Sequence, residues 1–357
     1  MSSLLQPVYL LIAAAIVSIA IILLVFVIYG HLHFNRKEYW YQKAARQRLE
    51  TWISEMIFSD PQDRPPISNE FYQMAKNPAG RSFVLNELVN ARKNFTDAAA
   101  ENTKFLYEQL GLKKYSLKKL NSSQWHVKAR GIQELYLMGQ SDVLKSIYKN
   151  TNAGHEFVRM EAQTGIIHMI GFEGLRFLDL VSYPLTEWQQ IKLLEQLNYS
   201  KMNVTLSPAI PGWLNSPNDT VVVFALKLAE EYQQIALHDT ILLCLRHPNE
   251  TVRRQAILTL VAIANEKTPR LLTEHFYTES LANRLIILDG LQKIATEQQA
   301  PFLIGQLEDE NDTIKLKAAK ALALNTDGGL TLLDEKSRQI PVPYREIFLH
   351  IKSEFAL

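Results

Sequence analysis

One stretch of this chain shows its organisation most clearly: HPNETVRRQAILTL, residues 247–260. A polar turn leads into Val252, and Ala256 and Leu260 follow at intervals of four residues. Residues four apart fall on one face of an α-helix, so this helix has an apolar face suited to packing. The stretch therefore predicts a turn followed by an amphipathic helix whose apolar face begins at Val252.

The same pattern recurs on both sides of Val252 at a spacing of about 31 residues. The counterparts of Val252, which together with it we call the anchor positions, are Val127, Val158, Gln189, Val221, Asn283 and Ile314. The register at Gln189 falls in LTEWQQIKLLEQL, which has a helical pattern but lacks the Val-Arg mark. A fixed period in this range is the signature of a helical repeat array.

Each repeat is expected to be a pair of helices that bury their apolar faces only by stacking on neighbouring repeats. Most repeats have a small residue four positions after the anchor, which permits close approach between helices: Gly131, Ala162, Ala225, Ala256 and Ala318. Ile287 breaks this rule. Three threonines stand just before their helices, where a hydroxyl can serve as an N-cap: Thr220, Thr251 and Thr313. The sequence predicts an all-α fold with about seven such repeats.

The turn followed by VRxxAxxxL resembles the HEAT repeats of the armadillo-like α-solenoid superfamily, in the short form common in bacterial proteins. The resemblance covers roughly residues 115–345. It implies a structural ladder between repeats, made by an acid in the turn and a base early in the second helix. The matching residues are Asp219 and Asp312 for the acid, and Arg159, Arg253 and Arg284 for the base, with Lys128 and Lys315 substituting. Val222 and Gln189 lack the base, so the ladder is expected to be broken in the middle of the array.

The N-terminal segment differs from the rest, because no Asp, Glu, Lys or Arg occurs before Arg36. Residues 8–29 are 22 almost wholly apolar residues, about 33 Å as a helix and enough to cross a bilayer. A cleaved signal peptide is the alternative, but the apolar run is too long and has no basic residues before it. The segment predicts a single-pass membrane anchor that contacts lipid through residues 8–29.

Flanking charge sets the expected orientation of this anchor. Basic residues follow it at Arg36, Lys37, Lys43, Arg46 and Arg48, and none precedes it. The sequence therefore predicts the plasma (inner) membrane, with a short N-terminus outside and a cytoplasmic C-terminal domain.

The expected domain map has five parts. They are a transmembrane anchor at 1–30, a juxtamembrane helix and Pro-rich linker at 31–68, an N-terminal helical cap at 69–114, the HEAT-like repeats at 115–345 and a closing helix at 346–357. Prolines end the juxtamembrane helix, and a cap is needed because the open end of a solenoid would expose apolar surface.

Composition and motifs argue against catalysis. The formal net charge is +1, which disfavours a nucleic-acid binder that neutralises phosphates broadly. A single cysteine, Cys244 in the run ILLCL, excludes an internal disulfide and a multi-cysteine zinc site, and is expected in the core. One His-Glu pair, His155-Glu156, does not recur in phase. We therefore expect no catalytic residues, no cofactor and no metal.

Binding is the remaining expectation, because solenoids present extended surfaces to partner proteins. The leading hypothesis is a membrane-tethered scaffold or adaptor whose cytoplasmic solenoid binds a partner protein. By resemblance to bacterial membrane-anchored HEAT-repeat proteins, it would be an accessory of a cell-envelope polysaccharide or signalling complex. The alternative is a HEAT-fold enzyme, hydroxylase- or lyase-like, that uses a concave pocket.

Overall fold

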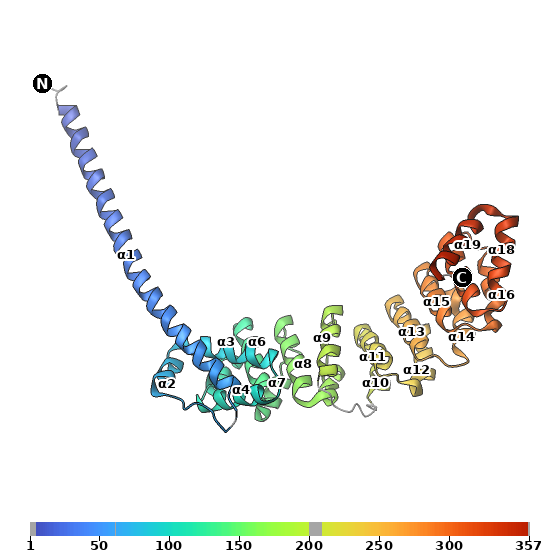
Figure 1. Ribbon diagram of the computed structural model, residues 1–357, viewed down its shortest axis with the longest axis horizontal. Helices are drawn as coiled ribbons and strands as arrows, with labels where there is room; N and C mark the ends of the chain where they lie inside the picture. Colours follow the sequence, from blue (N-terminus) through green and yellow to red (C-terminus); the bar gives the residue numbers. More distant parts are fainter. Residues whose placement is uncertain (1–4, 61, 200–208, 356–357) are drawn as a thin grey trace. The chain divides into compact units, whose positions relative to one another are not determined.

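The computed structural model describes residues 5–60, 62–199 and 209–355, and these form only helices, turns and loops. The chain divides into two compact units, Met1–Gln140 and Ser141–Leu357 (Figure 1). Low glycine and proline content and the four-residue apolar spacing favoured helices, and the expected all-α fold is confirmed for the described residues.

The first unit contains six helices within its described residues. They are α1 (Leu5–Phe58), α2 (Asn69–Lys76), α3 (Pro78–Asn94), α4 (Asp97–Gln109), α5 (Lys113–Leu120) and α6 (Trp125–Leu137). The last turns of α1 pack on α3 and α4, with Leu49, Ile53 and Met56 almost fully buried. The juxtamembrane helix of the sequence prediction is therefore the C-terminal part of α1, and its end belongs to the core of this unit.

A buried amide fixes the chain where α1 ends. The Nδ2 atom of Asn102 in α4 donates to the carbonyl oxygens of Ile57 and Ser59 at 3.0 and 2.7 Å. Its Oδ1 atom accepts from Arg64 Nε at 2.7 Å. These bonds hold the exit from α1, just before the proline-rich segment, against α4.

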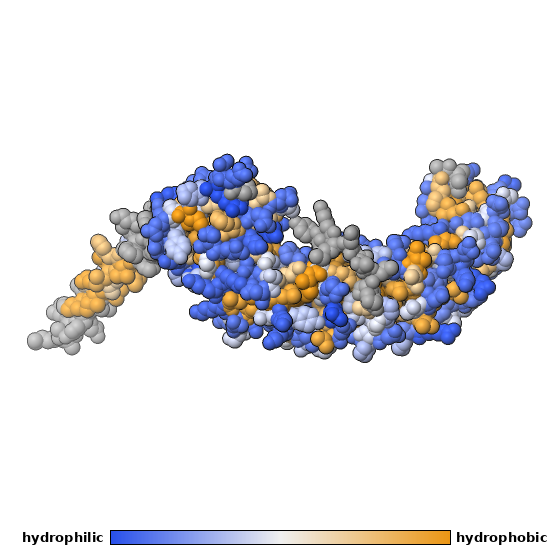
Figure 2. Space-filling model, turned by 90° about the horizontal axis from the view of Figure 1, so that it is seen from below, coloured by the Kyte–Doolittle hydropathy of each residue, from blue (hydrophilic) through white to orange (hydrophobic). Residues whose placement is uncertain are grey.

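The expected membrane anchor is corrected by the structure. The apolar run is not a separate element, because α1 continues from Leu5 through the charged residues to Phe58. Exposed apolar side chains lie along it at residues 15–29 and form the orange stretch of this helix in Figure 2. Among the residues that the structure describes, no helix is both long enough and apolar enough to cross a membrane. The predicted single-pass location in the inner membrane is therefore wrong.

The second unit alternates short and long helices. The short ones, which we call the A layer, are α7 (Leu144–Tyr148), α10 (Ile210–Trp213), α12 (His238–Leu243), α14 (Thr268–His275), α16 (Ala300–Gln306) and α18 (Gly329–Gln339). The B layer consists of α8 (Glu156–Ile170), α9 (Glu187–Tyr199), α11 (Asp219–Glu231), α13 (Glu250–Ala262), α15 (Leu281–Ile294), α17 (Asp312–Asn325) and α19 (Pro341–Phe355). The 3-10 segments are η1 (Ser141–Val143), η2 (Gly171–Asp179), η3 (Ile235–Leu237), η4 (Cys244–Arg246), η5 (Phe276–Thr278) and η6 (Glu297–Gln299).

Packing in this unit follows the predicted repeat. Each A helix packs on the B helix that follows it, and α11, α13, α15, α17 and α19 pack on one another in chain order (Figure 1). The anchors Val158, Val221, Val252 and Ile314 are at most 2% exposed. The faces around Val221, Val252 and Ile314 belong to one continuous apolar core, so the helical solenoid expected from the sequence is present in this unit.

The N-caps are asparagines rather than the expected threonines. Asn218, Asn249 and Asn311 have extended backbone conformations just outside their helices, whereas the threonines already lie inside the first turn. The Oδ1 atom of Asn249, for example, accepts from the backbone N–H of Thr251 at 2.8 Å. Asparagine is among the strongest N-cap residues, so this correction keeps the predicted helix starts.

The exception at Ile287 is resolved by a glycine one turn later. Ile287 is fully buried. At Gly290, a Cβ atom would lie 2.4 Å from Cγ2 of Val261, far inside van der Waals contact. Helices α13 and α15 therefore approach closely at Gly290 instead of at the usual small residue.

Candidate functional site

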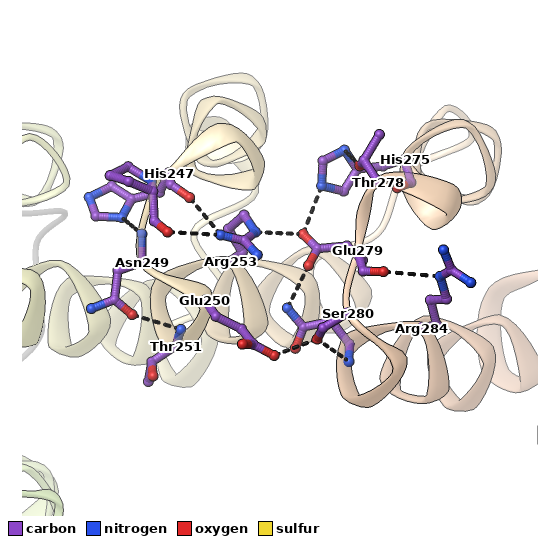
Figure 3. Close-up of polar contacts among 12 residues, drawn as sticks. His247, Asn249, Glu250, Thr251, Arg253, His275, Thr278, Glu279, Ser280 and Arg284 are labelled. Atoms are coloured by element: carbon purple, nitrogen blue, oxygen red, sulfur yellow. Dashed lines mark hydrogen bonds and ion pairs between the residues drawn. The ribbon is translucent and has the colours of Figure 1, made fainter.

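Glu279 is a fully buried carboxylate in the turn between η5 and α15. Arg253 of α13 donates from Nε to its Oε1 atom at 2.8 Å, and Nε2 of His275 lies 2.9 Å from the same oxygen. Asn283 of α15 donates from Nδ2 to Oε2 at 2.8 Å. Figure 3 shows Arg253 and His275 meeting Glu279 from two consecutive repeats. We call the four residues the Glu279 joint.

The joint keeps its carboxylate charged. Burial alone would raise the pKa of Glu279, but hydrogen bonds from Arg253, Asn283 and His275 outweigh it and hold the pKa below its usual value. A buried ion pair of this kind needs both partners, because either one alone would leave an uncompensated charge. The joint therefore fixes the spacing of two repeats.

A pH-dependent contribution to stability follows. The pKa of Glu279 is lower in the folded protein than in the unfolded chain, where it is about 4.3. The carboxylate therefore contributes its full stabilisation above about pH 4.3, and this stabilisation is lost as the pH falls through the pKa of the folded protein. We expect the free energies of unfolding of wild type and Glu279→Gln to converge as the pH falls below about 4.3. Urea denaturation across this range measures the difference.

Glu230 supplies a control of opposite sign. Burial is the largest influence on this carboxyl group and raises its pKa, although Gln255 donates to it. A raised folded pKa makes the wild type gain stability relative to Glu230→Gln as the pH falls. If both variants responded to pH in the same direction, the role assigned to the Glu279 joint would be wrong.

A shallow pocket of about 560 Å³ opens beside the joint. Its lining residues are Leu245, Arg246, His247, Arg253, His275, Thr278 and Glu279. Several of its polar groups already bond within the protein, since Arg253 donates to Glu279 and the Thr278 hydroxyl donates to the carbonyl of His275 at 2.7 Å. These groups hold the two repeats together, and a ligand would have to displace those bonds.

The three ladder arginines act first on their own turns. Each donates to two carbonyl oxygens of the turn before its helix, at 2.9 to 3.1 Å. The acceptors are Ala153 and Gly154 for Arg159, His247 and Pro248 for Arg253, and Tyr277 and Glu279 for Arg284. Arg253 in addition reaches the next repeat through the Glu279 side chain.

The remaining ladder residues differ among themselves. Asp219 contacts the next repeat, accepting at Oδ2 from Nδ2 of Asn249 at 2.6 Å. Asp312 pairs instead with Lys315 of its own helix at 2.9 Å. Lys128 is half-buried in α6 of the first unit. The residues predicted as one ladder thus include both contacts between repeats and contacts within one helix.

Of the predicted membrane-proximal basic residues, one has a described side chain. Arg48 is exposed, and its Nη1 atom lies 3.4 Å from Oε1 of Glu70. The side chains of Arg36, Lys37, Lys43 and Arg46 lie outside the described residues.

The structure places the residues that could bind a metal ion or act as a nucleophile. Within 5–60, 62–199 and 209–355, no three His, Cys, Asp or Glu side chains gather closely enough to hold a metal ion. Cys244 is buried, and burial raises the pKa of its thiol. A raised pKa disfavours the thiolate, which is the reactive form of cysteine.

The B layer has a second face, on the side of each helix opposite the anchor positions. Positions two, six and ten residues after each anchor lie opposite the buried anchor face, because they follow the same four-residue spacing half a turn away. In α13, α15 and α17 these positions form what we call the B-layer face: Arg254, Leu258, Ala262, Leu285, Asp289, Lys293, Leu316, Lys320 and Leu324.

The B-layer face presents apolar side chains to its surroundings. Leu258 is 39% and Leu324 is 42% exposed, and Leu285 and Leu316 are half-buried at the edge of the core. In α9, Ile191 occupies the corresponding position and is 51% exposed. This row follows the predicted register, but the sequence pattern marked only the anchor face, which lies on the other side of each helix.

No family model and no curated protein matches this chain. Among solved structures, an engineered protein is 11% identical, with a TM-score of 0.38, and covers 78% of this chain and 86% of its own. The CpcE–CpcF complex of phycocyanin lyase from Nostoc sp. PCC7120 is 12% identical, with a TM-score of 0.25 and coverages of 83% and 98%. A structure of tubulin recruitment by microtubule polymerases with TOG domain arrays is 12% identical, with a TM-score of 0.27 and coverages of 86% and 89%. With scores this low, the helical fold rests on the chain's own geometry.

Proposed function

We propose that this protein is a non-catalytic scaffold or adaptor that binds a partner protein across the B-layer face. The observation that carries the proposal is a group of leucines on one face of three consecutive B-layer helices: Leu258 and Leu324, which are exposed, and Leu285 and Leu316, which are half-buried. Single exposed apolar residues are ordinary, but a row held at fixed spacing by a rigid stack makes a continuous contact surface.

The chemistry of the pocket supports binding over turnover. The polar groups around Glu279 bond to one another and join two repeats. A catalytic group would need a free acid, base or nucleophile in reach of a substrate. The geometry therefore favours a structural role for the pocket side of these repeats and leaves the B-layer face for a partner.

Site-specific crosslinking in the native cells tests this assignment. A photoreactive residue is placed in the full chain at Leu285 or Leu316, and, as matched controls, at the A-layer positions Leu243 and Ile304, which are 68% and 38% exposed. We expect discrete protein adducts from Leu285 and Leu316 and none from the controls. Adducts from the A layer alone, or no adduct from any position, would overturn the proposal.

A further inference from the structure

We infer that the partner segment bound by the B-layer face is an acidic amphipathic α-helix lying across α13, α15 and α17. The inference rests on the proposed function and adds the chemistry of the partner. Three features carry it: the direction of the stacked helices, the line of leucines and the charge of the two layers.

The B-layer helices run parallel to one another. At their N-terminal ends, Ser280 before α15 donates to Glu250 of α13. At their C-terminal ends, Asn325 of α17 donates from Nδ2 to the carbonyl of Gln292 of α15 at 3.1 Å. Equivalent positions of successive helices are therefore neighbours. Leu285 and Leu316 occupy equivalent positions of α15 and α17, and Leu258 lies about one helical turn further along α13.

The spacing of this line suits a helix. Packed helix axes lie about 8–10 Å apart, and seven residues of an α-helix rise about 10.5 Å. Apolar residues at a seven-residue interval on one face of a partner helix would meet Leu285 and Leu316, and a tilt of that helix toward the C-terminal end of α13 would bring it to Leu258.

An extended peptide suits the surface less well. Its backbone N–H and C=O groups would lose water on docking and need hydrogen-bonding side chains beside them. The apolar line offers leucines there, and the neighbouring Asp289 is already paired with Lys317 and accepts from Gln292. A helix satisfies its own backbone groups and needs only apolar contact.

Charge selects an acidic helix. The B-layer face of α13, α15 and α17 carries three basic residues, Arg254, Lys293 and Lys320, and one acidic residue, Asp289, a balance of +2. The intervening A-layer segments, 263–280 and 295–311, carry two basic and seven acidic residues, a balance of −5. The exposed residues Arg254 and Lys293 lie on opposite sides of the leucine line. Acidic residues flanking the apolar face of the partner helix would pair with them, and the A layer would repel the same helix.

Binding of synthetic helices to the full chain tests the inference. Three labelled peptides of about 21 residues, which at 1.5 Å per residue span the three stacked helices, are compared by fluorescence anisotropy. The first is acidic with leucines at seven-residue intervals, the second has Lys in place of every Glu, and the third is acidic with the leucines dispersed. We expect the first peptide to bind at least about tenfold more tightly than either other peptide.

Variants of the chain locate the site. Leu285→Glu should weaken binding of the first peptide by about tenfold or more, whereas Ile304→Glu in the A layer should leave it unchanged. Arg254→Ala combined with Lys293→Ala should weaken binding at low salt and flatten its salt dependence.

The outcomes separate this inference from the proposed function. If the basic peptide or the peptide with dispersed leucines bound as tightly as the first peptide, or if no peptide bound, the inference of an acidic partner helix would be wrong. If crosslinks to a protein still formed at Leu285 and Leu316 in that case, the proposed protein-binding function would remain valid, with a partner of different chemistry. Crosslinks from the A layer alone would overturn both.

Discussion

Replacing Glu279 with alanine is expected to cost about 3 kcal/mol or more of folding free energy, because breaking a buried ion pair leaves its partners uncompensated. Arg253 would lose its carboxylate partner, and the Nδ2 atom of Asn283 would lose its acceptor. Both partners come from elements on either side of the repeat boundary, so the loss should loosen α13 against α15. Hydrogen exchange of amides in these two helices, together with urea denaturation, measures the effect.

Glu274 provides the matched control for this substitution. Glu274 lies in α14, five residues before Glu279, and pairs with Arg270 at 3.3 Å. Both side chains of this pair are more than half exposed. Exposed pairs contribute about 0–1 kcal/mol, so Glu274→Ala should change stability little. If the two variants were equally stable, Glu279 would not hold the repeats together.

Gly131→Ala is expected to destabilise the first unit by about 2 kcal/mol. A Cβ atom at Gly131 would lie 2.4 Å from the backbone nitrogen of Leu120 and 2.7 Å from Cβ of Lys119. Because the backbone of α5 cannot rotate away as a side chain could, the helices must separate. This cost exceeds the gain in helix propensity, at most about 1 kcal/mol, that alanine brings.

The separation would also disturb a buried carboxylate. Glu134 of α6 is fully buried, accepts from the Ser116 hydroxyl of α5 at 2.8 Å and pairs with Lys119. Thermal denaturation of the full chain should therefore show an earlier transition for Gly131→Ala.

Gly305→Ala serves as the comparison, because a Cβ atom added at this position in α16 would have no neighbouring atom within 4 Å. At this position only the higher helix propensity of alanine acts, so the stability of the variant should equal or slightly exceed that of the wild type. Equal behaviour of the two alanine variants would contradict a close approach of α5 and α6.

The repeat register could be predicted because it depends on local spacing. Val252, Ala256 and Leu260 lie on one helical face whatever packs against them, and the 31-residue period places their counterparts. Helix starts were predicted correctly even where the cap was assigned to Thr251 instead of Asn249, since both belong to the same turn.

The polar contacts between repeats could not be predicted from local pattern. Glu279 looks like an ordinary turn residue in the sequence, and its burial depends on Arg253, 26 positions earlier. Likewise, Gln189 was the weakest anchor, yet it is buried in α9 and donates to Gln163 of α8. In both cases a side chain from the neighbouring repeat supplies the partner that makes burial of a polar group favourable.

The N-terminal prediction failed for a different reason. The apolar run of 22 residues was interpreted from its hydropathy as a transmembrane anchor, followed by a juxtamembrane helix. In the structure, α1 passes from that run into the charged segment without a break and ends at Phe58, after Leu49, Ile53 and Met56 have joined the core. The membrane location was inferred from hydropathy and flanking charge alone, and neither shows how the end of α1 packs on the helices that follow it.

The most direct test of the B-layer face is the affinity of its partner. The partner protein that crosslinks to Leu285 would be purified. Its affinity would be measured for the wild type, for the double variant Leu285→Glu with Leu316→Glu, and for the A-layer variant Leu243→Glu. We expect the double variant to bind at least about 30-fold more weakly, as for residues at the centre of an interface, and Leu243→Glu to bind like wild type. Undiminished affinity in the double variant, or a loss confined to Leu243→Glu, would contradict binding through the B-layer face.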